Sequence, residues 1–179
     1  MPAGQHEYKF IKNIDKTVAT MYLYGEIGFD LNTYTGIDGA MFALEMDWLI
    51  RNYPDVKKIN VRINSPGGSV IDGFSIFSSI NNVNQNTKGV TVDTYNDGIA
   101  ASTAGWLLLA GKNIYMADFG MLMLHKPSFD SQEEMSKKDK DILQMFNNSI
   151  VTIFEAKTGL SRDEINAMME EETWMDAST

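Results

Sequence analysis

Residues 58–80, KINVRINSPGGSVIDGFSIFSSI, change their hydrophobic period from two residues to between three and four across a glycine turn. Ile59, Val61 and Ile63 alternate with polar residues, which predicts a β-strand with one buried face. The strand ends at Ser65-Pro66-Gly67-Gly68-Ser69, because a proline and two adjacent glycines interrupt regular pairing. The residues at helical spacing that follow are Val70, Phe74, Phe77 and Ile80. This stretch therefore predicts one βα unit.

Similar units flank this one. Expected strands are Thr17–Tyr24, Gly89–Tyr95, Asn113–Met116 and Met121–His125. A helix of about fourteen residues is expected around Met41–Leu49, ending before Pro54, and a second over Ala100–Ala110 after a turn at Asn96-Asp97-Gly98. Gly28–Gly36 has turn chemistry, and residues 1–14 are polar and weakly patterned. Strands that alternate with helices favour an α/β fold with a largely parallel sheet.

The C-terminal third has a different pattern. Gln132–Thr158 predicts one long helix that Gly159 terminates. Its apolar stripe is Met135, Ile142, Phe146, Ile150 and Ile153. If the helix stands away from the sheet, much of this stripe faces water in a monomer, so we expect it to form an interface. Ser161 and Glu164 then predict a capping box for a short helix through Glu171.

Composition narrows the class of protein. The 179 residues suit about one domain, and we find no linker, so we treat residues 1–179 as a single domain. Without cysteine, the chain has no disulfide, iron–sulfur cluster, zinc finger or cysteine nucleophile. A net charge of −9 disfavours nucleic acid and anionic lipid. No apolar stretch approaches the roughly 20 residues of a membrane span, and no signal segment opens the chain, so we expect a soluble, cytoplasmic protein.

Three segments could supply chemistry together. Ser102 follows a predicted strand among small residues at a helix start, where free amides favour a developing anion. The Gly67-Gly68 turn occupies the equivalent place one unit earlier, and His125 ends a later strand. Taken singly, each is more often structural: a helix that packs closely, a plain turn, a hydrogen-bonded histidine. Their common position at one edge of a parallel sheet makes a joint site the stronger hypothesis.

These segments, in this order, resemble the motifs of the Clp protease proteolytic subunit (ClpP) family. The matching motifs are Ile63–Val70, Gly98–Gly105 and Met123-Leu124-His125-Lys126-Pro127, within a resemblance that runs from about Thr17 to Ala177. Lys126 stands where the family commonly has glutamine. With this lysine and the acidic stretch at Glu170–Glu172, the chain resembles the phage head-maturation (prohead) branch of the family.

The resemblance implies a role for each matching residue. Ser102 would be the nucleophile and His125 the general base, with the amides of Gly68 and Thr103 as the oxyanion hole. Glu172 stands where the family has the triad aspartate, and Glu171 and Asp176 remain competitors for that role. An extended peptide substrate would lie along strand edges near Gly67, Ser69 and Lys126. No metal or organic cofactor is implied.

The resemblance also implies architecture and assembly. The fold would be the ClpP/crotonase-like spiral of βα units, with residues 132–158 as the protruding handle helix. Family members continue through a further helix and strand, so the C-terminal end is expected to be truncated. The function would be that of a serine endopeptidase inside a homo-oligomeric chamber, a heptameric ring or two stacked rings. An AAA+ unfoldase or phage capsid proteins are the further partners that the two branches imply.

Other functions remain open. A crotonase-like acyl-CoA enzyme shares the fold and the oxyanion hole, but it needs acidic catalytic groups and a cationic cleft, which the net charge of −9 disfavours. A catalytically impaired ClpP-like assembly subunit would keep the handle and the glycine turns while losing the triad acid. A Ser/Lys mechanism is the third alternative, although no position justifies Lys126 as its base.

Overall fold

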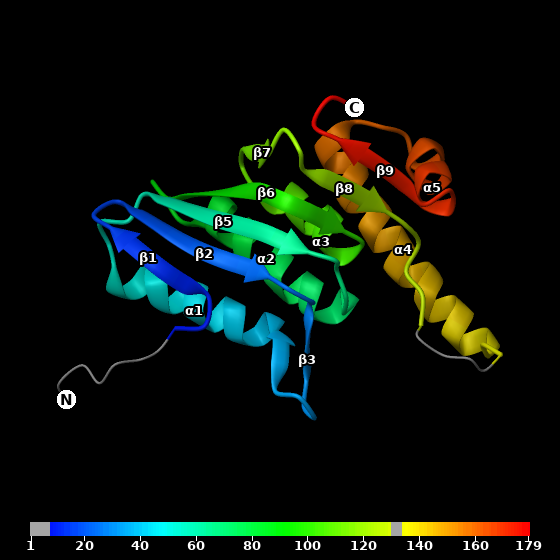
Figure 1. Cartoon of the computed structure of the whole chain (residues 1–179), viewed down its shortest axis with the longest axis horizontal. Coiled ribbons are helices and arrows are strands. Elements are labelled where there is room, and N and C mark those ends of the chain that lie inside the picture. The colour runs from blue at the N-terminus through cyan, green and yellow to red at the C-terminus, as the bar shows by residue number, and fades with distance from the viewer. Residues whose placement is uncertain (1–7, 130–133) are drawn as a thin grey trace.

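The computed structural model describes residues 8–129 and 134–179, which form a twisted sheet flanked by helices (Figure 1). The strands are β1 (Ile11–Asp15), β2 (Val18–Tyr24), β3 (Gly28–Asp30), β4 (Thr35–Ile37), β5 (Lys58–Ser65), β6 (Thr91–Ala101), β7 (Ile114–Met116), β8 (Met121–Leu124) and β9 (Thr173–Asp176). The helices are α1 (Gly39–Asn52), α2 (Val70–Asn86), α3 (Thr103–Leu107), the 3₁₀ turn η1 (Leu108–Ala110), α4 (Lys137–Thr158) and α5 (Arg162–Glu170).

The main sheet has the strand order β1-β2-β5-β6-β8-β9, and β7 also pairs with β6. β2, β5, β6 and β8 are parallel to their neighbours within this run, whereas β1 and β9 close the two edges in antiparallel pairing. The expected α/β fold of βα units is therefore confirmed. Because parallel strands end at the same edge, the segments that follow β5, β6 and β8 come together there.

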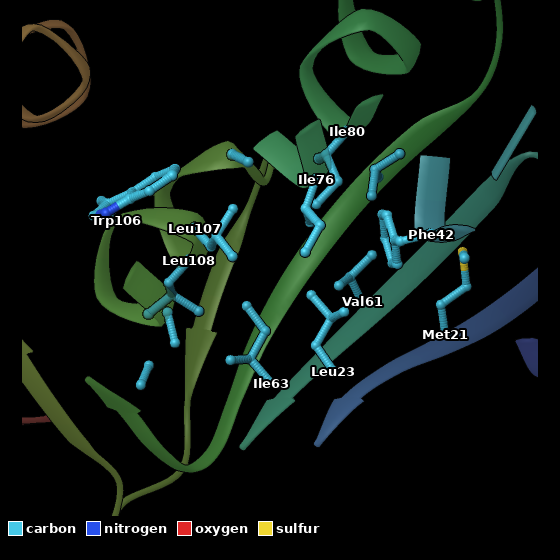
Figure 2. Packing of buried hydrophobic residues seen from close by; sticks show 14 of the residues in the cluster. Met21, Leu23, Phe42, Val61, Ile63, Ile76, Ile80, Trp106, Leu107 and Leu108 are labelled. Atoms are coloured by element: carbon cyan, nitrogen blue, oxygen red, sulfur yellow. The ribbon is translucent and has the colours of Figure 1, made fainter. Parts of the chain in front are cut away.

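The core lies between the sheet and the helices on one of its faces. Along β5, Ile59, Val61 and Ile63 are fully buried, while the alternate residues lie on the opposite, half-exposed face. Figure 2 shows Val61 and Ile63 in one cluster with Phe42 of α1 and Ile76 of α2. Burial of an aliphatic side chain stabilises the fold by about 1.5–3 kcal/mol, so the two-residue period of this strand sets its orientation.

The turn predicted at Asn96–Gly98 is wrong, because β6 runs continuously from Thr91 to Ala101. The pairing of β5 with β6 shifts register between Ile63 and Ser65, and side chains satisfy the displaced backbone groups. The Asn96 side chain accepts from Gly98 N, and the Asn64 side chain accepts from Ile99 N. The helix expected over Ala100–Ala110 is correspondingly shorter, since α3 begins only after Ser102.

The N-terminal edge and the first turn hold structure that the sequence pattern missed. β1 lies within the segment that is polar and weakly patterned, and Gly28–Gly36 contains the small hairpin of β3 and β4. β1 is anchored by Glu45 of α1, whose carboxylate accepts from the amides of Lys9, Phe10 and Ile11 at 2.7, 2.9 and 3.1 Å. Glu45 is only 7% exposed, so this carboxylate replaces the strand partner that an edge lacks.

The long helix protrudes as expected, but its apolar stripe is divided. α4 begins at Lys137, and the predicted start at Gln132 lies outside the described residues. The C-terminal half of α4 packs onto the core, so Ile150 is only 2% exposed, and the expectation that this part of the stripe faces water is wrong. Phe146 is half-buried, with its ring 6.2 Å from that of Phe74. The protruding half is visible in Figure 1, and there Met145 is 68% exposed.

The remaining C-terminal expectation is confirmed. Ser161 and Glu164 form the capping box of α5. Within residues 8–129 and 134–179, none of the helices combines the length and the apolar character that a membrane crossing requires.

The anchoring of β1 gives a stability prediction. Glu45→Ala leaves the buried amides of Phe10 and Ile11, at the start of β1, without an acceptor. Each costs about 1–3 kcal/mol, so we expect the free energy of unfolding to fall by about 3 kcal/mol. Urea unfolding measures this, with Asp47→Ala as the control. Asp47 forms an exposed pair with Arg51 on the same helix, and its loss should cost less than about 1 kcal/mol. Equal effects of the two substitutions would contradict the anchoring role.

Candidate active site

Ser102 lies on a strained turn between β6 and α3. Its φ of 55° and ψ of −121° are unusual for a residue with a side chain. Hydrogen bonds on both sides hold this conformation: Ser102 N donates to Met123 O at 3.0 Å, and Gly105 N donates to Ser102 O at 2.9 Å. Such strain persists only where the surroundings impose it, and its effect here is to project the hydroxyl from the strand end.

His125 lies directly after β8 and reaches Ser102. Its Nε2 is 2.7 Å from Ser102 Oγ, which is hydrogen-bond distance. The same β8 segment supplies Met123 O to the Ser102 amide, so one strand positions both members of the pair. The sequence places these residues 23 positions apart, and the parallel pairing of β6 with β8 brings them together.

Glu172 is the carboxylate that faces the other ring nitrogen. Its Oε2 lies 4.0 Å from His125 Nδ1, which is longer than a hydrogen bond, and its side chain is 57% exposed. Glu172 has a φ of 51° immediately before β9, whose pairing with β8 sets Thr173 opposite Leu124. Trp174 Nε1 donates to Glu172 Oε1 at 3.3 Å.

The two competing acids lie elsewhere. Asp176 is at the far end of β9, where the pairing sets it opposite Met121. Its carboxylate accepts from the side chains and amides of Ser178 and Thr179, and these hydrogen bonds lower its pKa to about 2. Glu171 is the residue that ends α5, and its amide donates to Ala167 O. Of the three acids, Glu172 is the one with a recorded contact to His125.

The glycine turn packs against Ser102 so closely that larger residues cannot replace its glycines. A Cβ on Gly67 would lie 2.7 Å from Ser102 Cβ, and one on Gly68 would lie 2.0 Å from Ile27 O. Both glycines also have positive φ, at 100° and 135°. Thr103 reinforces the contact, because its hydroxyl donates to Gly68 O at 2.7 Å.

This contact leaves two amides available beside the serine. Across residues 8–129 and 134–179, the amides of Gly68 and Thr103 donate to no backbone or side-chain acceptor. Free, fixed N–H groups next to a nucleophile are what an oxyanion hole requires. Within the same residues, no three of the His, Asp and Glu side chains are grouped as metal ligands would be.

A cleft of about 470 Å³ opens over Ser102 and His125. Its walls come from the glycine turn and the start of α2, from the segment after β8, and from the protruding half of α4. The side chains that it presents are mostly apolar: Val70, Ile71, Pro127, Phe129, Leu143 and Phe146. A volume of this size accommodates an amino-acid side chain with part of its backbone.

The three residues predicted to contact substrate differ in their surroundings. Gly67 and Ser69 flank the free amide of Gly68, but their own amides already donate, to Ser65 Oγ and to Ile27 O. Ser69 lines the cleft. The Lys126 ammonium forms an ion pair with Glu170, which joins the segment after β8 to the end of α5. Lys126 also lies outside the set of residues that lines the Ser102 cleft.

Sequence reasoning missed two features of the site. The pair of Lys126 with Glu170 links residues 44 positions apart, so no local pattern indicates it. Glu26 also lines the cleft, although it lies between β2 and β3, far before the three motifs in the sequence. The one sequence signal that could have indicated Glu26 is its position two residues before Gly28, at the start of a segment rich in turn residues.

Comparison with known proteins identifies the family of this chain. The sequence model of the Clp protease family matches residues 6–179. The ATP-dependent Clp protease proteolytic subunit of Porphyromonas gingivalis is 29% identical over 126 residues, which cover 68% of this chain and 54% of the relative. Proteolytic subunit 1 of Chlamydia abortus is 31% identical over 144 residues, covering 77% and 72%. The subunit of Bacteroides fragilis is 32% identical over 127 residues, covering 68% and 58%.

The chain thus spans about half to three quarters of the length of these curated relatives. The family match covers nearly the whole sequence, including the glycine turn, the strained serine and the histidine. This chain belongs to the Clp protease family.

Proposed function

We propose that the chain is a serine endopeptidase that cleaves extended or unfolded peptides. The observation that carries the proposal is the 2.7 Å contact between His125 Nε2 and Ser102 Oγ, next to the free amides of Gly68 and Thr103. A nucleophile, a base and two donors for a developing oxyanion are the parts that acyl transfer needs.

The reaction begins at Ser102. With the ring proton on Nδ1, His125 Nε2 accepts the hydroxyl proton as Oγ attacks the peptide carbonyl. The carbonyl oxygen becomes an anion, and the amides of Gly68 and Thr103 stabilise it. His125 then returns the proton to the leaving amine. Water enters in its place, and the same base activates it to hydrolyse the acyl-enzyme.

Glu172 serves as the triad acid in this proposal. A carboxylate near Nδ1 fixes the tautomer and stabilises the imidazolium that forms during attack. The 4.0 Å separation is longer than the final contact, and catalytic hydrogen bonds often tighten only when substrate is bound. Glutamate has one more methylene than aspartate, and this longer side chain brings Oε2 to within 4.0 Å of His125 Nδ1.

The peptide substrate lies in the cleft, with Ser69 on its wall and Gly67 supporting the oxyanion amides. A contact of Lys126 with the substrate stays a prediction, since its ammonium is engaged by Glu170 when no peptide is bound. We propose that the described fold acts as one peptidase domain, with α4 as the handle. Met145, exposed on that handle, supports self-association. The resemblance to the family then implies a ring of seven, or two stacked rings, that would screen the sites from folded proteins.

One observation favours a second candidate. Glu172 is exposed and beyond hydrogen-bond distance of His125, as expected of an assembly subunit with impaired catalysis. The two candidates differ in the reactivity of Ser102, which a covalent probe measures directly.

We expect a fluorophosphonate probe to acylate Ser102 near neutral pH, because only a hydroxyl beside a base and an oxyanion hole is nucleophilic there. Peptide mapping by mass spectrometry identifies the labelled serine. Ser102→Ala should abolish labelling, while Ser75→Ala, which alters an exposed serine of α2, should leave it intact. Equal labelling of the Ser102→Ala variant contradicts the peptidase proposal, and an unreactive wild-type chain favours the impaired subunit.

The triad acid can be tested by comparing isosteric variants. Glu172→Gln removes the charge that orients His125, so we expect acylation of Ser102 to slow by about 10²- to 10⁴-fold. Glu171→Gln and Asp176→Asn serve as matched controls from the same segment and should remain within a few-fold of the parent rate. The assignment is wrong if either control is the damaging change while Glu172→Gln is mild.

Assembly through the handle gives a further prediction. Met145→Asp places a charge on the exposed apolar surface of α4 without touching the core, so it should dissociate the oligomer and leave the unfolding temperature of the subunit almost unchanged. Light scattering and thermal unfolding measure the two effects, with Met145→Leu as the control that keeps the assembly. A wild-type chain that is monomeric at micromolar concentration refutes this role of the handle.

A further inference from the structure

Glu26 is the acidic residue among the described residues that line the Ser102 cleft. The other lining groups are apolar side chains, hydroxyls, a glycine and His125. Glu26 thus carries the formal negative charge among the described residues that line the cleft. It is therefore the feature of the cleft most able to discriminate between charged substrates.

The backbone of Glu26 is held firmly beside the glycine turn. Ile37 N donates to Glu26 O at 2.9 Å, and the next residue, Ile27, is bonded on both sides. Ile27 N donates to Gly67 O, and Ile27 O accepts from Ser69 N, each at 2.7 Å. Glu26 is thus fixed in position next to the amide that is proposed to bind the oxyanion.

The carboxylate itself has no partner in the part of the chain that the structure describes. Glu26 is exposed, and none of the ion pairs or side-chain hydrogen bonds among residues 8–129 and 134–179 includes its carboxylate. Lys9 and Lys12 also line the larger groove, and their ammonium groups donate to the backbone oxygens of Gly36 and Tyr8. Neither forms an ion pair with Glu26. A fixed backbone with an unpaired charge suits a ligand contact better than a structural one.

The surroundings leave room for a peptide to pass this carboxylate. A larger groove of about 1150 Å³ adjoins the cleft, and both hollows are lined by Glu26 and Ser69. A peptide with one side chain in the apolar cleft can therefore continue past Glu26 into the groove. A neighbouring side chain of that peptide would then lie beside the carboxylate.

We propose that Glu26 is a specificity-determining residue, which selects peptides carrying a lysine or arginine within one or two residues of the scissile bond, beside an apolar side chain in the cleft. This inference rests on the proposed peptidase function and names the substrate class of the same site. A basic side chain gains an ion pair with Glu26, and an acidic one is repelled by it. The interaction forms on binding and persists through the reaction, so it acts mainly on KM.

The test uses fluorogenic peptides with a common apolar residue and arginine, glutamine or glutamate at the neighbouring positions. We expect kcat/KM to be roughly tenfold higher for the arginine peptide than for the glutamate peptide, since each exposed charge contact is worth only a few-fold. The ratio should shrink as salt is raised from about 0.05 to 0.5 M, because salt screens exposed charges. Glu26→Gln should remove the preference, and Glu26→Lys should reverse it.

Asp30→Asn is the matched control. It removes the same charge from the larger groove, but Asp30 does not line the Ser102 cleft, so the arginine preference should survive. If the preference falls equally in both variants, the general charge of the groove is responsible and the role of Glu26 is refuted.

Two further outcomes separate this inference from the proposed function. Cleavage of all three peptides at equal rates overturns the role of Glu26 and leaves the peptidase intact. Absence of both cleavage and fluorophosphonate labelling of Ser102 overturns the peptidase and this inference together.

Discussion

The close approach of the Gly67-Gly68 turn to Ser102 is the constraint on which the site depends. A methyl group at Gly67 would collide with the serine, and one at Gly68 would collide with Ile27. Because both positions lack a Cβ, the turn after β5 packs directly on the turn after β6. The free amides of Gly68 and Thr103 therefore lie beside the same hydroxyl, and Ile27 holds the outer side of the turn.

A second contact, between the end of β8 and the start of β9, fixes the positions of His125 and Glu172. β8 gives its Met123 carbonyl to the serine amide and carries His125 at its end, so the serine and the histidine cannot move independently. β9 pairs antiparallel with β8 and brings Glu172 up to the imidazole. The ion pair of Lys126 with Glu170 lies at this junction. The relative positions of His125 and Glu172, the proposed base and acid, thus follow from strand pairing at the edge of the sheet.

Charge is distributed unevenly around the cleft over Ser102 and His125. Apolar side chains from α2 and α4 line the cleft over Ser102, and Glu26, whose carboxylate has no partner among the described residues, lines the same cleft. An anionic group near a developing oxyanion opposes catalysis unless a cation compensates it. A cation on the substrate would pair with Glu26 on binding and stay paired during attack at Ser102, which is why the proposed selection acts mainly on KM.

The sequence by itself determined the βα units, the glycine turn, the capping box at Ser161 and the family. These depend on local periodicity and on residue types with restricted backbone conformations, and both can be recognised from neighbouring residues in the sequence. Ser102 and His125 could be named because motifs of fixed order carry them, whereas the sequence left Glu171, Glu172 and Asp176 as alternatives for the third residue. The continuous β6, the edge strands β1 and β9 and the burial of Ile150 were decided by tertiary structure alone. In each case a distant partner satisfies the backbone or covers the side chain: Asn64 supports β6, Glu45 anchors β1, β8 pairs with β9, and the core covers the C-terminal half of α4. No local pattern records such contacts, because their free energy comes from groups that lie far apart in the chain.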